Sequence, residues 1–372
     1  MELGAKITSM KRKRAESGEA ETACPFLDLL LEDEIMVRIF SLLGNGITCL
    51  RTHSRVCKRF RSLMKNPLLW EQEIRIGAPK KFFATDLQMI SPEISAYPVR
   101  SLHLSMVSEA VPSTIALARS LFSLRLTLRL LIVDFNSYET FPIALLVGHL
   151  TGLTRLVLNA VPGIDEDDPG LYHYDILFDG EELGDLSESL AQLKRLESLV
   201  LSSIPIRQST LDTILTTNHL TSFEFSGDNG IFHHHYDLSH LMLSLSNTSQ
   251  LTHLDISKGI ERDGQSRWTH TTQTSSALTS LTKLKSLKIR LDEVEASCFF
   301  YWIRNLPALR TVEIDKLMSG GWVDERREAP SNLTQLKLLN ISADLRLLVS
   351  RWLTSLSSLT KLETGFVDFF NT

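Results

Sequence analysis

Carboxylates crowd into one segment of this chain and make it the first candidate for chemistry. The stretch from Asp165 to Asp185 carries nine carboxylates and no Lys or Arg. Its spacing lacks the D-x-D-x-D-G register of a calcium-binding EF-hand loop, so a calcium site is disfavoured. We expect a self-repelling acidic insertion, and the alternative is a surface that steers a basic substrate segment.

Imidazoles form the second candidate. His233, His234 and His235 are consecutive, and Asp237 and His240 follow closely. Adjacent imidazoles on an extended loop point apart, whereas zinc requires ligands at turn-like spacing with a fixed second shell. We therefore expect a polar loop, with no metal and no cofactor bound.

The third candidate is a loop suited to binding a protein. Residues 320–327 combine Trp322 with Arg326 and Arg327, and these residue types are enriched at binding hot spots. A solvated loop is the alternative.

Motifs for catalysis are missing from the sequence: it has no G-x-S-x-G, Walker A, HExxH or strand-associated GxGxxG pattern. We expect a protein that is not an enzyme.

Composition narrows the class of protein further. The chain has 372 residues, 43% of them apolar, and a net charge of −5, which argues against a nucleic-acid partner. Its four cysteines are scattered, which indicates reduced thiols. The longest apolar stretch, residues 117–133, contains three arginines and does not suit a membrane span of about 20 apolar residues. Lys11–Arg14 is a candidate nuclear localisation signal, so we expect the cytoplasm, the nucleus or both.

One hydrophobic pattern returns along most of the chain from Val99 onward. It has the form L-x-x-L-x-x-L-x-L, and we anchor each copy two residues before its last apolar position. Most intervals between anchors are 23 to 33 residues, and one is 43. The anchors are Leu102, Leu131, Leu156, Leu199, Phe223, Leu254, Leu287, Val312, Leu339 and Leu362.

The physics of this pattern predicts a stacked architecture. The final L-x-L is a short strand with alternate side chains pointing inward, and segments such as Leu345-Leu348-Trp352 carry a helical stripe. One strand and one helix cannot close a core, so the copies must stack on each other. The pattern is similar to leucine-rich repeats, although the family's usual asparagine after the strand is absent, and we expect irregular turns. We predict an α/β solenoid with a curved parallel sheet inside and helices outside.

The positions between the buried strand residues are the predicted binding surface for a protein substrate. In this pattern they alternate with the inward side chains and point to the other side of the sheet. Together with Trp322, the candidates are Arg155, Asn159, Glu224, Asp255, Lys288, Arg290, Glu313 and Asp315.

A different pattern occupies residues 31–70. Leu31, Ile35, Ile39 and Leu42 recur at helical spacing, Gly44-Asn45-Gly46 breaks the helix, and further apolar helical positions run on to Pro67. Three short helices of this size are at the limit of autonomous stability and normally need a partner.

This segment resembles the F-box, the helical module that attaches substrate receptors to a Skp-type adaptor in cullin-RING ubiquitin ligases. The match runs over Asp33-Glu34-Ile35, Ile39-Phe40-Ser41-Leu42-Leu43, Val56-Cys57-Lys58-Arg59-Phe60 and Pro67-Leu68-Leu69-Trp70. The resemblance implies that an apolar set docks the adaptor. That set is Leu31, Ile35, Ile39, Leu42, Val56, Phe60, Leu69 and Trp70.

The sequence thus divides into four parts. We expect a disordered basic tail at 1–24, a three-helix F-box at 25–72, a helical linker at 73–98 and a repeat domain at 99–372 with an acidic insertion at 161–186. The implied function is the substrate-recognition subunit of a Skp–cullin–F-box ubiquitin ligase, which brings a protein substrate to the transfer machinery without catalysing the step. The alternative is a leucine-rich scaffold or GTPase regulator without a ligase. We expect no membrane partner.

Overall fold

The structure is a computed structural model, and it describes the following residues. They are 33, 36, 37, 39, 58–63, 66, 73–76, 99–106, 121, 122, 124–136, 147–161, 188–202, 204, 208–217, 219–226, 243–257, 277–290, 294–319 and 332–367. Two compact units divide the chain: Met1–Ile74 with Ala96–Ser101, and Arg75–Ser95 with Leu102–Thr372. We call them the helical unit and the repeat unit.

The helical unit contains α4 (Lys58–Leu63), and residues 33, 36, 37 and 39 are also helical. Met36, Val37, Phe60 and Leu63 are buried. Arg59 on α4 donates to Asp33 through Nε at 3.0 Å and through Nη2 at 2.8 Å. The unit thus joins two segments that lie 26 residues apart.

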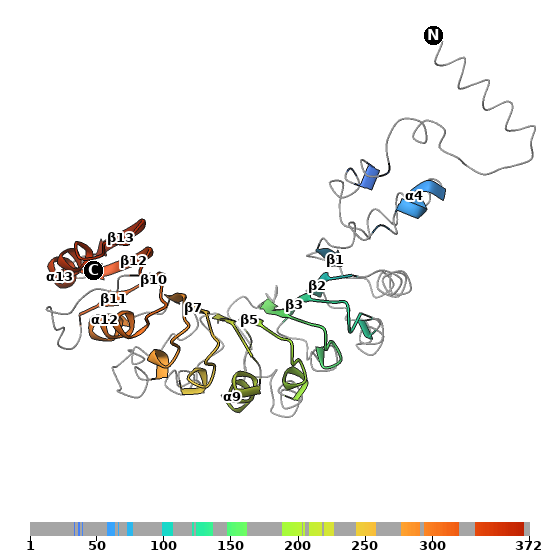
Figure 1. Cartoon of the computed structure of the whole chain (residues 1–372), viewed down its shortest axis with the longest axis horizontal. Coiled ribbons are helices and arrows are strands. Elements are labelled where there is room, and N and C mark those ends of the chain that lie inside the picture. Colours follow the sequence, from blue (N-terminus) through green and yellow to red (C-terminus); the bar gives the residue numbers. More distant parts are fainter. Residues whose placement is uncertain are drawn as a thin grey trace, which may run out of the picture. The chain divides into compact units, whose positions relative to one another are not determined.

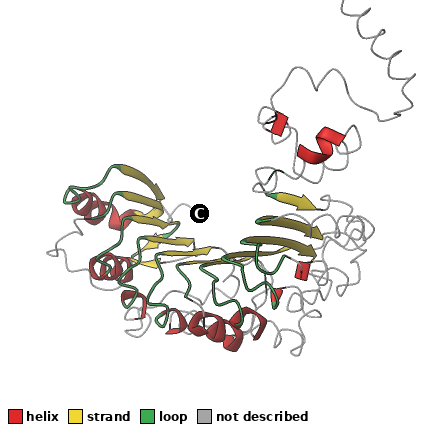
Figure 2. Cartoon of the chain, turned by 45° about the vertical axis from the view of Figure 1, so that its right-hand side comes forward, coloured by secondary structure: helices red, strands yellow, loops and turns green. Residues whose placement is uncertain are grey.

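The described residues of the chain form a 13-stranded sheet whose path runs β1-β2-β3-β4-β5-β6-β7-β8-β10-β12-β11-β9, with β13 also paired to β12. Every pairing among β3 to β13 is parallel. In the repeat unit the strands line the inner side and the helices lie on the outer side (Figures 1 and 2). The strands are β1 (Ile74–Ile76), β2 (Ser101–Met106), β3 (Leu130–Asn136), β4 (Arg155–Val161), β5 (Ser198–Ser202), β6 (Ser222–Ser226), β7 (His253–Ser257), β8 (Ser286–Arg290), β9 (Val294–Glu295), β10 (Thr311–Ile314), β11 (Leu317–Met318), β12 (Gln335–Ser342) and β13 (Lys361–Val367).

The register confirms the stacked α/β architecture that the leucine pattern predicts. Leu131 aligns with Leu156 on the next strand, and the alignment continues through the later anchors as far as Val312. All of these anchors are buried, so one continuous apolar core runs under the sheet.

The ninth anchor is wrong. Val312 aligns with Leu336 rather than Leu339, and Leu336 in turn aligns with Leu362. The intervals are therefore 24 and 26 residues instead of 27 and 23. The reason is an irregularity in β12 between Leu338 and Ile341, where Asn340 adopts a positive φ of 47°. Asn tolerates this left-handed conformation, and the extra residue returns Ile341 to the buried side that Leu336 and Leu338 occupy.

The outer helices are α9 (Gln208–Thr217), α12 (Ala296–Asn305) and α13 (Arg346–Leu353), which follows the short 3-10 helix η2 (Ala343–Leu345). In this outer layer, the side chains of Phe299 and Trp302 of α12 are buried. Trp352 of α13 makes edge-on contacts with Phe299 and Phe300, with ring centroids 5.6 and 5.2 Å apart. These aromatic contacts pack α13 against α12, the helix of the neighbouring repeat.

A hydrogen-bonded ladder runs along the turns where the strands begin. The carbonyl of Thr221 accepts the N–H groups of Thr252 at 2.8 Å and His253 at 3.0 Å, and the carbonyl of Thr252 accepts those of Lys285 and Ser286. The threonine hydroxyl joins in, because Thr252 Oγ1 lies 2.9 Å from the Thr221 oxygen. Thr154, Thr221, Thr334 and Thr360 make the same bond to the preceding repeat. Hydroxyls at the strand starts thus connect repeats that lack the usual asparagine after the strand.

We expect Thr252→Val to lower the free energy of unfolding by about 0.5 to 1.5 kcal/mol. The substitution removes the hydroxyl's bond to the Thr221 carbonyl, which keeps its two backbone donors, and its 2.7 Å contact with the exposed His253 Nδ1. Thr282→Val, in an exposed turn, is the matched control and should be close to neutral. Urea denaturation of both variants measures the difference. Equal stability of the two variants would contradict the ladder.

The linker differs from expectation where the structure describes it. Ile74–Ile76 is strand β1 and not helix. Its apolar–charged–apolar alternation with β-branched Ile at both ends favours a strand over a helix. The rest of the linker at 77–98, the tail at 1–24 and residues 162–186 of the acidic insertion at 161–186 lie outside the described residues.

Candidate binding site on the strand face

The strand face consists of the strand side chains that alternate with the buried positions. Its central row runs through the third residue of each strand, and the register places these residues side by side. The row begins apolar and becomes charged. Its members from β3 to β13 are Ile132, Val157, Val200, Glu224, Asp255, Lys288, Glu313, Lys337 and Glu363.

Opposite charges alternate in the second half of this row. Lys288 Nζ lies 3.4 Å from Asp255 Oδ2, and Lys337 Nζ lies 3.4 Å from Glu313 Oε1 and 3.6 Å from Glu363 Oε1. The Glu313 carboxylate raises the pKa of Lys337. Burial opposes this increase, and Glu363 adds a smaller upward contribution. The ammonium group therefore stays charged over the whole physiological range.

These ion pairs hold the side chains against each other and balance most of the charge within the row. Each pair is partly exposed, so its contribution to stability is small, at about 0 to 1 kcal/mol. Their effect on recognition is larger, since a partner must replace the contacts that it breaks. A segment lying across β6, β7, β8, β10, β12 and β13 would meet a charged group on each of these strands, at roughly 4.8 Å spacing.

A polar cluster lies at the other end of the strand face, on β2 to β4. His103 Nε2 is 2.6 Å from Asp134 Oδ2, and Asn159 Nδ2 donates to Asp134 Oδ1 at 2.8 Å. All three side chains are half-buried. Because Asp134 accepts from both neighbours, its carboxylate is fixed in orientation and links three repeats.

The structure places most of the predicted substrate-binding residues on this face. Glu224, Asp255, Lys288 and Glu313 stand next to each other in the central row, on β6, β7, β8 and β10. Arg155 and Asn159 lie together on β4, at the first and fifth positions of that strand. Arg290 ends β8, and Asp315 follows β10 and is half-buried. Trp322 lies outside the described residues.

Sequence reasoning missed four members of the face. Lys337 and Glu363 extend the charged row, and His103 and Asp134 form the polar cluster with Asn159. The signal for Lys337 was its place between Leu336 and Leu338, which the wrong anchor at Leu339 concealed. His103 and Asp134 follow from the same alternation, because His103 separates two buried leucines and Asp134 follows Val133.

In the helical unit the structure describes two of the predicted adaptor-binding residues. Phe60 is 4% exposed, so its side chain packs inside the protein, whereas Ile39 is half-exposed. The other predicted residues, Leu31, Ile35, Leu42, Val56, Leu69 and Trp70, lie outside the described residues, as does the histidine segment at 233–240.

No group of three or more His, Cys, Asp or Glu residues in the described ranges could hold a metal ion. Within those same ranges, no helix is both long enough and apolar enough to cross a bilayer. The strand face offers carboxylates, ammonium groups, amides and hydroxyls as hydrogen-bonding and ion-pairing partners.

Comparison with known proteins identifies the helical segment. Residues 33–72 match the family described as F-box-like. A search of curated proteins finds no match. Among solved structures, the leucine-rich repeat-containing protein LegL7 from Legionella pneumophila is 11% identical, with 79% of this chain and 91% of that chain covered and a TM-score of 0.43. The TLR13–ssRNA13 complex contains a chain that is 15% identical, with 77% of this chain and 50% of that chain covered and a TM-score of 0.33.

The repeat assignment stands on the strand register and on the recurring leucines, and the helical assignment stands on the family match. The chain thus contains an F-box-like domain at residues 33–72, which precedes a sheet of parallel strands built on a recurring leucine pattern.

Proposed function

We propose that the chain is the substrate receptor of a Skp–cullin–F-box ubiquitin ligase. The F-box-like domain binds a Skp-type adaptor, and the strand face of the repeats holds a target protein. The observation that carries the proposal is the F-box-like match at residues 33–72, because F-box domains in general bind this adaptor. The protein then contributes proximity and orientation, while the cullin-RING assembly supplies the chemistry.

The burial pattern of the helical unit supports a docking role for part of its apolar set. Met36, Val37, Phe60 and Leu63 are buried, which leaves the half-exposed Ile39 as a described candidate for the adaptor contact. Ile35 lies one helical turn earlier in the sequence and belongs to the same stripe. Apolar side chains at the centre of an interface carry most of its binding energy.

Co-expression with a Skp-type adaptor tests the proposal. We expect a stable complex of one copy of each chain, and we expect Ile35→Asp with Ile39→Asp to weaken it at least about 30-fold, since a loss of 2 kcal/mol or more is typical of interface hot spots. Leu347→Asp, a similar change at an exposed position of α13, is the control and should leave binding unchanged.

Circular dichroism and thermal melting of the same variants show whether the fold is intact. A chain that is folded and does not associate with any Skp-type adaptor at micromolar concentration would contradict the proposal and favour a scaffold without a ligase.

A further inference from the structure

We propose that the edge of the repeat sheet at which its strands begin binds an acidic segment of a partner protein. In taking this partner to be the ligase target, the inference rests on the proposed function. The surface itself does not depend on the F-box, and its binding can be measured without an adaptor.

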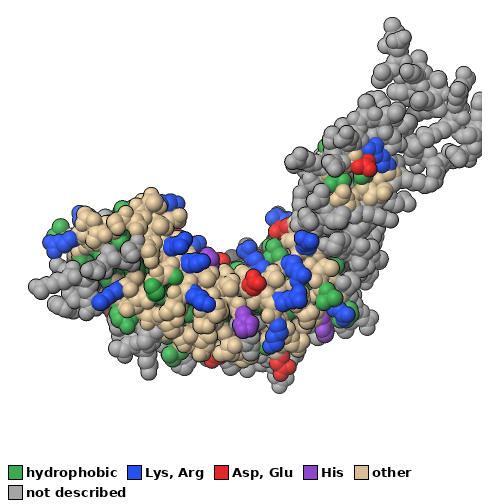
Figure 3. Space-filling view, viewed as in Figure 1, with side chains coloured by type: hydrophobic (Ala, Val, Ile, Leu, Met, Phe, Trp, Pro, Cys, Tyr) green, Lys and Arg blue, Asp and Glu red, His purple; other side chains and the backbone are tan. Residues whose placement is uncertain are grey.

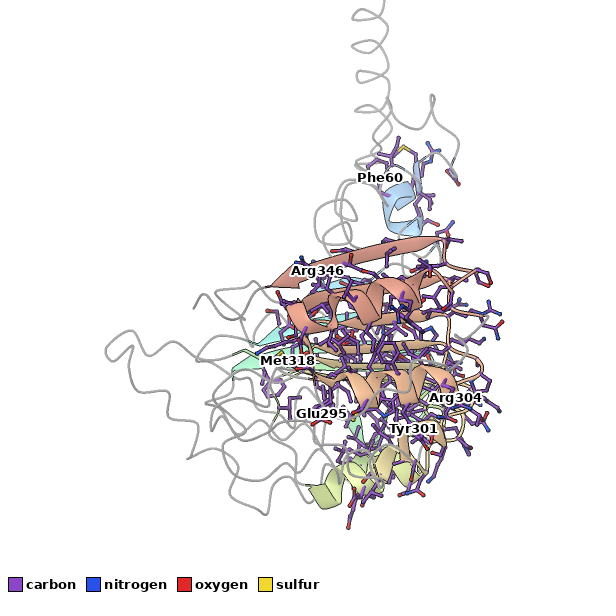
Figure 4. All side chains as sticks on the ribbon, turned by 90° about the vertical axis from the view of Figure 1, so that its left-hand side faces the viewer. Phe60, Glu295, Tyr301, Arg304, Met318 and Arg346 are labelled. Carbon is purple, nitrogen blue, oxygen red and sulfur yellow. The ribbon has the colours of Figure 1, made fainter. Side chains whose placement is uncertain are left out.

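The geometry of the sheet gathers the relevant side chains on one side. Because the strands are parallel, the turn before each strand lies along the same edge, where the carbonyl ladder connects neighbouring turns. The outer helices run back toward this edge, so α12 ends there at Arg304. Figure 4 shows Arg304 at the right, on the opposite side from Met318 at the end of β11.

The first group of cations on this edge belongs to β3, β4 and β5. Arg125, Arg155, Lys194 and Arg195 are exposed, and Arg129 is half-buried. The turns that carry them are bonded to each other, since Arg155 N donates to the Arg129 carbonyl at 2.9 Å. Arg129 Nη1 also donates to the Gly152 carbonyl at 2.6 Å, which holds that side chain in place.

The second group belongs to β8 and β10. Lys283, Lys285, Arg304 and Arg310 are all exposed. Their turns are also joined, because Arg310 N donates to the Lys285 carbonyl at 2.8 Å. Lys361 extends the same edge at the start of β13.

These cations lack carboxylate partners. Within the described ranges, neither group forms an ion pair, and the polar contacts of the side chains are those of Arg129 with the Gly152 carbonyl and Lys283 with Gln250. The lysines of the central row behave differently, because Lys288 and Lys337 are each paired with an acid. In the described turns before β3 to β8, β10, β12 and β13, only Glu188 and Glu197 are acidic. Figure 3 shows Lys and Arg gathered on this face of the repeat unit, with few acidic side chains visible among them.

Charge and side-chain type together favour a carboxylate-rich protein segment as the ligand. Arginine presents a planar fork that binds carboxylates in bidentate fashion. Single-stranded nucleic acid would instead require aromatic platforms for its bases. On this edge the Phe122 ring already has the Arg125 guanidinium over one face, 4.5 Å from its centroid. The net charge of −5 also opposes general attraction to nucleic acid.

The spacing of the two groups defines the ligand further. The strands β6 and β7 lie between them, and their turns contribute neutral side chains such as His219, Thr221 and Gln250. Three strand steps from β5 to β8 correspond to roughly 14 Å. An extended chain covers this span with about four residues. The expected ligand therefore carries two acidic clusters separated by about four residues.

Fluorescence anisotropy with the full-length chain tests the inference. The probe is a labelled peptide with two short runs of glutamate separated by four Ser or Gly residues, and its reference is the same peptide with Gln in place of Glu. We expect only the Glu peptide to bind, with affinity falling as salt rises from about 50 to about 300 mM. Lys194→Glu with Arg195→Glu, and separately Lys285→Glu with Arg310→Glu, should each weaken binding about tenfold.

Lys316→Glu with Arg346→Glu makes the same charge change away from this edge and serves as the control, with melting curves to show that all variants are folded. Equal binding of the Glu and Gln peptides, equal losses in the edge and control variants, or tighter binding of a short oligo-uridylate would each overturn the inference. None of these results depends on the adaptor, so failure here is distinguishable from failure of the ligase proposal.

Discussion

Phe223→Ala is expected to lower the free energy of unfolding by about 3 to 5 kcal/mol, the range for removing a large aromatic side chain from a core. Phe223 is 1% exposed and lies on β6 near the middle of the repeats. Leu199 and Leu254 flank it on the neighbouring strands, and its ring is stacked with that of Phe225 at a centroid distance of 6.3 Å.

The effect should exceed that of a similar change at an end of the sheet. In a stacked solenoid each repeat contacts only its neighbours, so a central cavity weakens two interfaces at once. Leu362→Ala on β13 is the comparison, because Leu362 occupies the equivalent register position and is 47% exposed. Urea denaturation followed by circular dichroism measures both. A loss below about 1 kcal/mol for Phe223→Ala would contradict a core that is continuous through β6.

Gly152→Ala is expected to cost about 2 kcal/mol, through crowding and not through a cavity. An added Cβ would lie 2.9 Å from the carbonyl oxygens of both Arg125 and Leu126. Both oxygens belong to backbone, and Gly152 N already donates to the Arg125 carbonyl at 2.8 Å, so the turn cannot move without breaking that bond.

Gly365→Ala is the matched control for this prediction. The nearest atom to its added Cβ is Asn340 N at 3.8 Å, an ordinary contact, so the change should be close to neutral. Thermal melting of the two variants gives the comparison. The Gly152 carbonyl accepts a hydrogen bond from the Arg129 side chain. Gly152→Ala should therefore also weaken the binding of the acidic peptide to the strand-start edge. Equal melting temperatures of the two alanine variants would contradict the close approach of these turns.

The recurring L-x-L pattern was enough to predict the sheet, its parallel order and the buried anchors. Buried positions on successive strands must be apolar for the repeats to stack, so these positions can be recognised in the sequence. On β12 the same pattern predicted the wrong anchor, because L-K-L-L-N-I contains two apolar pairs in succession. Only the positive φ of Asn340 and the pairing with Val312 select Leu336 as the anchor.

The candidate sites were less predictable than the core, because they depend on which side chains meet across repeats. Asn159 could be placed on the strand face, but its bond to Asp134 and the contact of that carboxylate with His103 join three separate repeats. The basic edge was missed for a similar reason. Its arginines and lysines are scattered over more than 200 residues of a chain with a net charge of −5, and only parallel stacking brings their turns to one side.

Hydrogen exchange of the full-length chain with and without a Skp-type adaptor tests the central proposal most directly. We predict slower exchange in the amides of residues 31–70 when the adaptor is added, while the strands from β3 to β13 exchange at unchanged rates. No change at 31–70 with saturating adaptor, or protection confined to the repeat strands, would contradict an adaptor-binding F-box in this chain.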